Sequence, residues 1–161
     1  MVPALKPLAA IARLNTRLYL NCLADMDDAP AGRRLSEDVN DVAFIALHVL
    51  DARCFLARQL GGRAKPAVTA ALAHVNSAGD LKERPPVESI RRAWLDLAPK
   101  LERRLAAVTS AHLARKAKPQ FPIEDRTILG AVAFLLEHES YHIGQLALLR
   151  KYLGLGPMKY R

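Results

Sequence analysis

The sequence predicts an all-α protein, a single domain in which four long amphipathic helices pack as a bundle. Alanine and leucine contribute 27 and 26 of the 161 residues, whereas the β-branched residues Val, Ile and Thr together number only 19. This balance favours helix over sheet, because straight-chain side chains keep more rotamer freedom in a helix than β-branched ones do. A hydrophobic fraction of 51% and a charged fraction of 25% are ordinary for a globular domain and exclude disorder and collagen-like repeats. We therefore expect one domain over residues 1–161.

Apolar residues at three- and four-residue spacing predict the first two helices. The first extends from about Pro3 to Leu23, and a polar turn follows it. We expect Ser36 to cap the second helix, because its hydroxyl can accept a hydrogen bond from an exposed backbone amide. The second helix is expected to end at Gly61–Gly62, where glycine suits the left-handed conformation that follows many helices.

The second half of the chain predicts two more long helices after a long connection. The connection is expected to contain a short extra helix near Ala67–Val75. The third helix begins after Pro85–Pro86, and the fourth extends from Thr127 to Leu153, where Gly154 ends it. The connection is long enough to return along a second helix of about 37 Å, at 1.5 Å per residue. A parallel arrangement of the second and third helices is therefore possible, although the periodicity does not require it.

Charge and hydropathy narrow the classes of partner. The net charge is +8, from 24 Lys and Arg against 16 acids, but the basic residues are spread from Lys6 to Arg161. No basic stripe is interleaved with aromatic residues, so we expect a solvated basic surface, with a nucleic-acid contact as the less favoured alternative. The uncharged stretch from Thr127 to Leu136 is too short to span a bilayer, and no membrane association is expected.

Two cysteines, Cys22 and Cys54, lie within apolar helical patterns and lack the spacing of a CxxC motif. We expect both to be buried, reduced thiols in a cytoplasmic protein, with a catalytic thiol as the less favoured alternative.

Two histidines four residues apart are the main candidates for chemistry. On a helix, His138 and His142 differ by about 40° around the axis and by about 6 Å along it. Their face also carries Phe134, Leu135 and Leu149, and two imidazoles on a mainly apolar face are costly unless they have partners. A divalent metal is one such partner, because neutral ring nitrogens at this spacing can both reach one ion. A pair of hydrogen-bonded histidines without a metal is the alternative.

The letters between the two histidines suggest two known kinds of metal enzyme. The run HESYH, residues 138–142, matches the HExxH pattern of zinc metalloproteases, but no His, Asp or Glu follows it as a third ligand. Gln145 and Leu148 also stand where a metzincin has its glycine and third histidine. An ExxH motif is part of di-iron carboxylate sites, but these need a second ExxH motif and two further glutamates, which the chain lacks. We expect neither a protease nor a di-iron protein.

A third ligand can instead come from upstream. His48 lies midway along the second predicted helix, in register with Ile45 and Phe55 on a stripe that faces the core. His74 and His112 lie in connections beside polar or basic residues and are expected to be exposed to solvent. Together with the pair on a facing helix, His48 would complete a three-histidine site with open positions for water or substrate. A hydrogen-bonded core histidine is the alternative for His48.

These segments resemble the DinB-like superfamily, also called YfiT-like or DinB/maleylpyruvate isomerase-like, over nearly the whole chain. The resemblance is strongest from Phe134 to Gly154, which contains an HxxxHxGQ run and a leucine-rich end. A second matching segment begins with residues 40–48, NDVAFIALH, and continues to the predicted helix end at Leu60–Gly61. The resemblance implies an up-down-down-up four-helix bundle, and homodimers are common in this superfamily. It also implies a divalent metal, nickel or zinc, whose ligands are His48, His138 and His142.

The same resemblance suggests activities and leaves alternatives. Characterised members include metal-dependent S-transferases and isomerases that use a low-molecular-weight thiol such as bacillithiol, mycothiol or glutathione. Glu139 is a candidate base, although a solvated or subunit-facing carboxylate is favoured, and Gln145 and Tyr141 are candidates for substrate binding. We therefore expect a transferase that takes a small thiol and an electrophile. The alternative is a non-catalytic dimer or stress-associated binding protein with a relict metal site.

Overall fold

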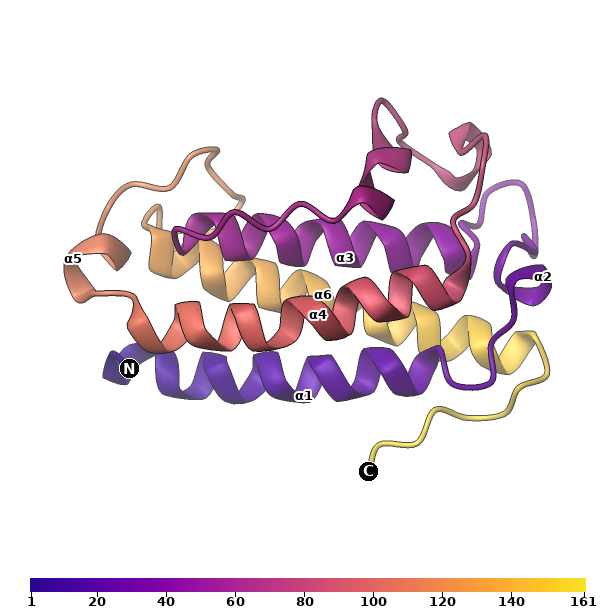
Figure 1. Ribbon diagram of the computed structural model, residues 1–161, viewed down its shortest axis with the longest axis horizontal. Helices are drawn as coiled ribbons and strands as arrows, with labels where there is room; N and C mark the ends of the chain where they lie inside the picture. Colours follow the sequence, from indigo (N-terminus) through magenta and orange to yellow (C-terminus); the bar gives the residue numbers. More distant parts are fainter.

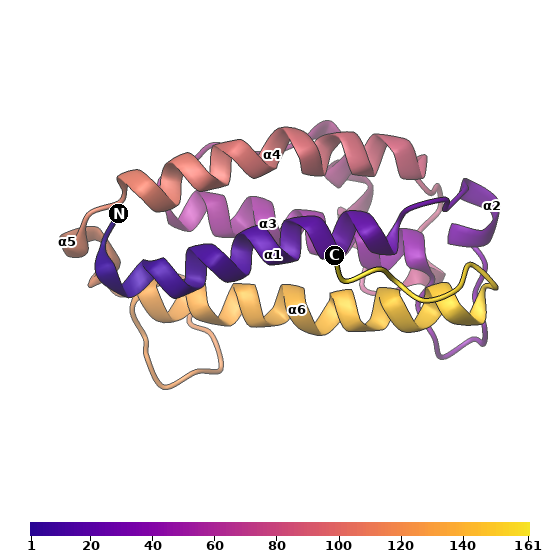
Figure 2. The same cartoon turned by 90° about the horizontal axis from the view of Figure 1, so that it is seen from below.

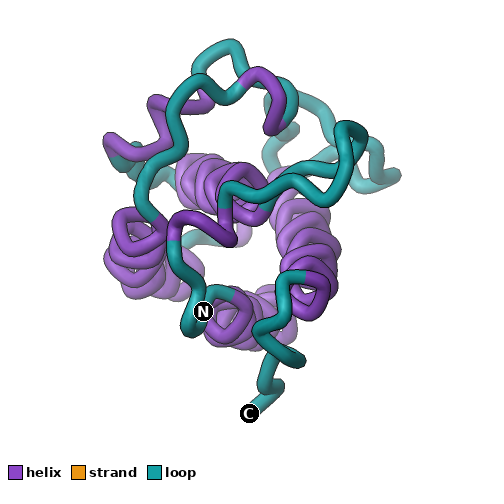
Figure 3. The backbone as a smooth tube through the Cα atoms, turned by 90° about the vertical axis from the view of Figure 1, so that its right-hand side faces the viewer, coloured by secondary structure: helices purple, strands orange, loops and turns teal.

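The computed structural model describes all 161 residues and contains helices but no strands. Its four long helices lie side by side along the molecule (Figure 1), and Figure 3 views the same helices from one end. They are α1 (Lys6–Cys22), α3 (Val42–Gln59), α4 (Val87–Ala107) and α6 (Ile128–Tyr152). Short helices occupy the ends and connections: η1 (Pro3–Leu5), α2 (Asp28–Ala31), η2 (Ala67–Leu72), η3 (Ala78–Asp80) and α5 (Ser110–Leu113). None of these helices is both long and apolar enough to cross a membrane.

Each long helix packs against two others around one apolar core of 39 buried residues. Helix α6 contacts α3 and α1, and α4 contacts the same two helices. At the centre, the rings of Tyr19 and Trp94 stack with centroids 3.9 Å apart. The Tyr19 hydroxyl donates to the carbonyl of Ala46 at 2.8 Å, and Trp94 Nε1 donates to the carbonyl of Thr16 at 3.1 Å. The two large aromatic residues therefore bury their polar atoms with partners, as core Tyr and Trp require.

The third and fourth predicted helices are confirmed close to their expected bounds. Pro86 directly precedes α4, and the Thr127 hydroxyl accepts a hydrogen bond from the Gly130 amide at the start of α6. The short extra helix is present as the 3-10 helix η2. Gly61 follows α3 with φ of 79°, the left-handed conformation expected of a glycine at a helix end.

The predicted start of the second helix is wrong. Ser36 lies in a bend, and α3 begins six residues later, with Asp41 as its cap. The Asp41 carboxylate accepts from the Phe44 amide at 2.8 Å and is itself held by Arg84, whose guanidinium lies 2.7 Å away. Asp41 is itself a preferred capping residue, and Arg84, from the distant connection before α4, adds a contact that local sequence signals do not include.

The connection after α3 returns along the outside of that helix before α4 begins (Figure 1), and η2 contacts both α3 and α4. At the other end of the chain, the segment after α6 folds back towards α1 (Figure 2). There the Asn21 side chain donates to the carbonyl of Lys159 at 2.6 Å. These two extended segments flank the bundle on different sides.

Both cysteines are free and fully buried, as predicted. Burial raises the pKa of the Cys22 and Cys54 thiols to about 12, so both remain neutral thiols at physiological pH. We expect neither residue of the folded protein to react with iodoacetamide at pH 8, whereas both react in urea. Mass spectrometry of the alkylated protein provides the measurement. Equal alkylation rates in the native and unfolded states would contradict this prediction.

Candidate metal site

Three histidines from two facing helices converge on one point. Helix α3 supplies His48, and α6 supplies His138 and His142 from consecutive turns. His138 Nε2 lies 3.1 Å from His48 Nε2 and also 3.1 Å from His142 Nε2. One ligand atom from each residue lies within 4.8 Å of the others, so the three could hold a metal ion together.

The other two histidines lie outside this cluster. His74 is exposed, as predicted. The prediction for His112 is wrong in part, because its ring is half-buried and its Nε2 lies 2.8 Å from the carbonyl of Gln59 at the end of α3. The local sequence around His112 is polar, and only the folded chain brings that carbonyl to it.

The arrangement of ring nitrogens fits a cation better than it fits shared protons. A neutral imidazole has a single N–H, so His138 Nε2 can donate to only one of its two nitrogen neighbours. His142 Nδ1 lies 2.7 Å from Gln145 Oε1, an acceptor, which places the ring proton on Nδ1 and leaves a lone pair on Nε2. His138 Nδ1 is buried without a hydrogen-bond partner. A divalent ion satisfies three convergent lone pairs at once, and three histidines with open positions are a common ligand set.

Burial keeps these imidazoles in the form that binds metals. Desolvation, with the neighbouring histidines adding to it, lowers the pKa of His48 to about 4. Desolvation also lowers the pKa of His138, and His142 contributes in the same direction. Both rings are therefore neutral at pH 7, with lone pairs available for a ligand.

This depressed pKa predicts how the stability of the metal-free protein depends on pH. His48 of the unfolded chain takes up a proton near pH 6.5, whereas in the folded chain it does so only near pH 4. The unfolded state thus binds more protons between these values, and the contribution of His48 to stability, complete above pH 6.5, falls as the pH is lowered. We expect a loss of about 2 to 3 kcal/mol from this residue across the window. Urea unfolding at pH 7 and at pH 4.5, in the presence of a chelator, measures it.

The His48→Phe variant is the control for this measurement, because it removes the titrating group and keeps a ring of similar size. Its free energy of unfolding should change less over the same pH range than that of the wild type. The same pH dependence in both proteins would show that other groups cause it.

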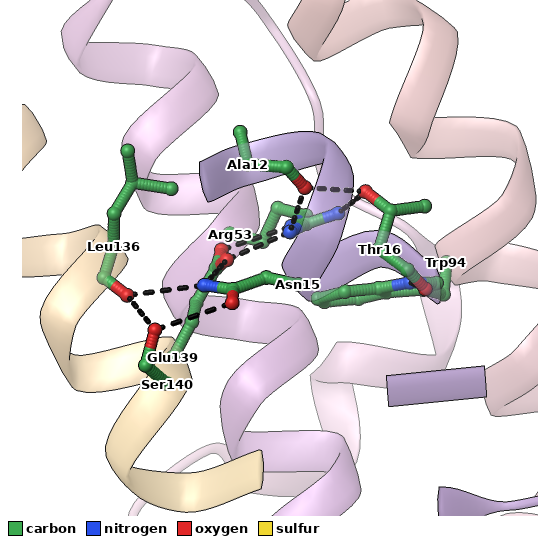
Figure 4. A network of polar contacts seen from close by, with 8 residues as sticks. All are labelled: Ala12, Asn15, Thr16, Arg53, Trp94, Leu136, Glu139 and Ser140. Carbon is green, nitrogen blue, oxygen red and sulfur yellow. Dashed lines mark hydrogen bonds and ion pairs between the residues drawn. The ribbon is translucent and has the colours of Figure 1, made fainter. Parts of the chain in front are cut away.

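Glu139 follows His138 in the sequence, but its side chain turns into the centre of the bundle (Figure 4). Its two carboxylate oxygens accept from the Arg53 guanidinium at 2.9 and 2.7 Å, and both side chains are almost completely buried. Asn15 of α1 also donates to this carboxylate, at 3.4 Å, and to the carbonyl of Leu136. The prediction of a solvated or subunit-facing Glu139 is therefore wrong. Because Arg53 engages both oxygens, we assign Glu139 a structural role.

Arg53 links all four long helices from its position on α3. Besides Glu139 of α6, it donates to the Thr16 hydroxyl of α1 at 2.6 Å and to the Ala12 carbonyl at 3.3 Å (Figure 4). Its guanidinium carbon lies 3.6 Å from the centre of the Trp94 ring of α4, a cation–π contact. The Arg53–Glu139 ion pair joins α3 and α6, the two helices that supply the histidines. Arg53 lies five residues after His48, and Glu139 directly follows His138. The pair therefore helps to fix the relative position of the metal-ligand candidates.

A sequence signal for this network existed. Arg53 stands on the stripe of α3 that carries the buried Ala46, Leu50 and Ala57, and Asn15 stands among buried apolar residues of α1. A charged residue on a core-facing stripe needs a buried partner of opposite charge. In the sequence, Glu139 stands out only as the neighbour of His138, and no local pattern pairs it with Arg53.

Gln145 and Tyr141 lie on the outer side of the histidine cluster. Gln145 is half-buried, and its Oε1 accepts from His142 Nδ1 while its Nε2 donates to the Tyr141 hydroxyl at 3.3 Å. Tyr141 is 59% exposed, and its ring centroid lies 5.1 Å from that of His142. Gln145 thus orients the ring of His142, as the outer partners of metal-bound histidines commonly do. Tyr141 presents an aromatic surface to solvent beside the cluster.

The chain is all-helical, and its long helices bring three histidines together at one point. It is therefore a helical protein of the class that could hold a metal ion. The family model described as the DinB superfamily matches residues 12–146, and the chain belongs to this superfamily. The resemblance inferred from the HxxxHxGQ run is confirmed. The matched range includes the three histidines together with Arg53 and Glu139. No curated protein matches the chain.

Proposed function

We propose that this protein binds a divalent metal ion through His48, His138 and His142 and transfers a low-molecular-weight thiol to an electrophile. The observation that carries the proposal is the convergence of three imidazole Nε2 atoms, two pairs of them 3.1 Å apart. Membership of the DinB superfamily supports it. Nickel and zinc are the metals that we propose first, because imidazole nitrogen suits both.

The residues of the chain have separate tasks in this proposal. The three histidines would hold the ion, which would act as a Lewis acid and favour the thiolate form of a thiol. Gln145 keeps the proton of His142 on Nδ1, so that Nε2 remains a ligand. Tyr141 lies at the solvent side of the cluster, where its hydroxyl and ring can contact an incoming substrate. The Arg53–Glu139 pair holds α3 and α6 in register behind the histidines.

In this proposal the four long helices form an up-down-down-up bundle. The protein is cytoplasmic and acts as a homodimer. The path of the chain in Figure 1 supports the topology, because the connection after α3 returns along that helix and α4 then runs in the direction of α3. Exposed apolar side chains on α6 support the dimer: Tyr141, Leu148 and Tyr152, which lie on one side of the helix. Light scattering coupled to size-exclusion chromatography measures the oligomeric state directly.

Metal content and thiol conjugation test the proposed function. Elemental analysis of untagged protein should find about one equivalent of divalent metal, and His48→Ala should lose it. His74→Asn is the matched control, because His74 is exposed and its φ of 62° suits asparagine. The loaded wild type should then conjugate one of bacillithiol, mycothiol or glutathione to a model electrophile, and His142→Ala should not.

Two results would contradict this function. Absence of metal after incubation with nickel, zinc, manganese and iron(II) would remove the metal site. Stoichiometric metal without conjugation of any of the three thiols would remove the transferase activity and favour the non-catalytic binding protein.

A further inference from the structure

A pocket lies between α4 and the connection after α3. It has a volume of about 960 Å³ and shares no residue with the histidine cluster. This volume is within the range of small-molecule sites in proteins, about 300 to 1,000 Å³. The pocket exists because the connection returns along α3 and η2 contacts both α3 and α4.

The rim of this pocket is strongly basic. Six cationic side chains line it, and Asp96 is the one acidic residue among the lining residues. The cations are Arg63 and Lys65 of the connection and Arg92, Lys100, Arg103 and Arg104 of α4. Four of the six are arginines, whose planar guanidinium binds phosphate and carboxylate groups through two parallel hydrogen bonds.

Five of these six cations form no ion pair within the protein. Arg92 lies 3.9 Å from Glu88 in an exposed pair, and the other three ion pairs of the molecule involve none of the pocket cations. Arg92, Asp96, Lys100 and Arg104 recur every four residues, so they follow one face of α4 over about 18 Å. Asp96 lies between Arg92 and Lys100 in this row, whereas Lys100 and Arg104 are successive like charges with Arg103 beside them. An anion bound among these three cations relieves their repulsion.

The floor of the pocket is apolar and built from small residues. Its lining includes Ala57 of α3, Ala93 and Leu97 of α4, and Pro66 and Val68 of the connection. The small alanine side chains leave room that larger residues would fill. No Phe, Tyr or Trp lines the pocket, so it lacks the stacking surfaces on which single-stranded nucleic acids bind.

We propose that this pocket binds an organic anion, a small molecule with an apolar body and a phosphate, sulfonate or carboxylate group. The apolar body occupies the alanine-lined floor, and the anionic group lies among Lys100, Arg103 and Arg104. This site is separate from the histidine cluster and does not depend on the metal or on the proposed transferase activity.

Fluorescence titration tests the proposal with the probe 8-anilinonaphthalene-1-sulfonate. The wild type should bind this anion saturably, octyl phosphate should displace it, and the uncharged analogue N-phenyl-1-naphthylamine should bind at least tenfold more weakly. The Lys100→Glu/Arg104→Glu variant should bind both anions at least tenfold more weakly. The matched control is Arg13→Glu/Arg17→Glu, which changes the net charge equally at two exposed α1 residues, also four apart. It should stay within twofold of the wild type.

Two further variants separate the parts of the proposal. Ala93→Leu fills the floor without changing the charge. It should weaken the binding of octyl phosphate more than the binding of inorganic phosphate. His48→Ala should leave the affinity for the probe unchanged, whether or not the metal site exists. Circular dichroism checks that each variant remains helical.

Three results would overturn the proposal. The first is no saturable binding of the probe or of octyl phosphate by the wild type. The second is an equal loss of affinity in the two double-charge variants, which would indicate a general effect of net charge. The third is displacement of the probe by a single-stranded oligonucleotide at concentrations well below those needed for octyl phosphate, which would assign the surface to nucleic acid.

Discussion

Replacement of Arg53 by alanine is expected to lower the free energy of unfolding by about 3 to 5 kcal/mol. The substitution leaves the Glu139 carboxylate buried without its counter-charge, and burial of an unpaired charge is among the most costly changes in a protein interior. It also removes hydrogen bonds to Thr16 and Ala12 and the contact with Trp94. Because domains are stable by only about 5 to 15 kcal/mol, the variant should lose a large part of its stability.

Urea unfolding followed by circular dichroism measures this loss. The double variant Arg53→Met/Glu139→Leu removes both charges at similar volume and should be more stable than Arg53→Ala. Arg91→Ala is the matched control, because it removes an arginine from the surface pair with Glu88 and should cost less than about 1 kcal/mol. A loss below 1 kcal/mol in Arg53→Ala would contradict the importance of the buried pair. If this variant does not fold, Arg53→Lys provides the comparison.

Addition of a divalent metal is expected to stabilise the wild type by about 4 kcal/mol at a free metal concentration one thousand times the Kd. At the same metal concentration, the His138→Ala variant should lose at least about two thirds of this stabilisation. His138 Nε2 is the central nitrogen, 3.1 Å from the Nε2 atoms of both His48 and His142. Loss of an outer partner of a metal ligand lowers affinity by about 10 to 100-fold, so loss of a ligand itself should exceed a hundredfold.

Differential scanning calorimetry during nickel and zinc titrations measures the stabilisation, and competition with a chelator gives the Kd. Gln145→Ala should weaken metal binding by about tenfold, because His142 loses the acceptor that fixes its ring proton. His74→Asn should leave the affinity unchanged. Equal stabilisation of the wild type and of His138→Ala by the metal would place the binding site elsewhere.

The parts that the sequence predicted well are those that depend on neighbours in the chain. The start of α4 follows Pro86 and that of α6 follows Thr127, because proline and a capping hydroxyl act on the next turn of the helix. The proximity of His138 and His142 follows from helix geometry in the same way. His48 was found as the remaining histidine on a core-facing stripe, and α3 then had to pack against α6 for the three to meet.

The features that local sequence patterns did not predict depend on residues far apart in the chain. Helix α3 begins at Val42, and Arg84, more than forty residues away, holds the carboxylate of its capping residue Asp41. Glu139 is buried because Arg53 pairs with it across 86 positions of sequence. The basic pocket likewise arises where the connection after α3 faces α4, whereas the sequence showed only scattered basic residues.

The sequence by itself determined the helical class, the bounds of most helices and the proximity of His138 and His142, since each follows from interactions within a few residues. It also identified His48 as the third candidate ligand. Only the tertiary structure decided which charged side chains are buried in the core, Glu139 among them, and which cations line the same pocket. A buried charge is tolerated only where a partner from another helix reaches it. Such partners are selected by the packing of the whole chain, and local sequence patterns do not contain that information.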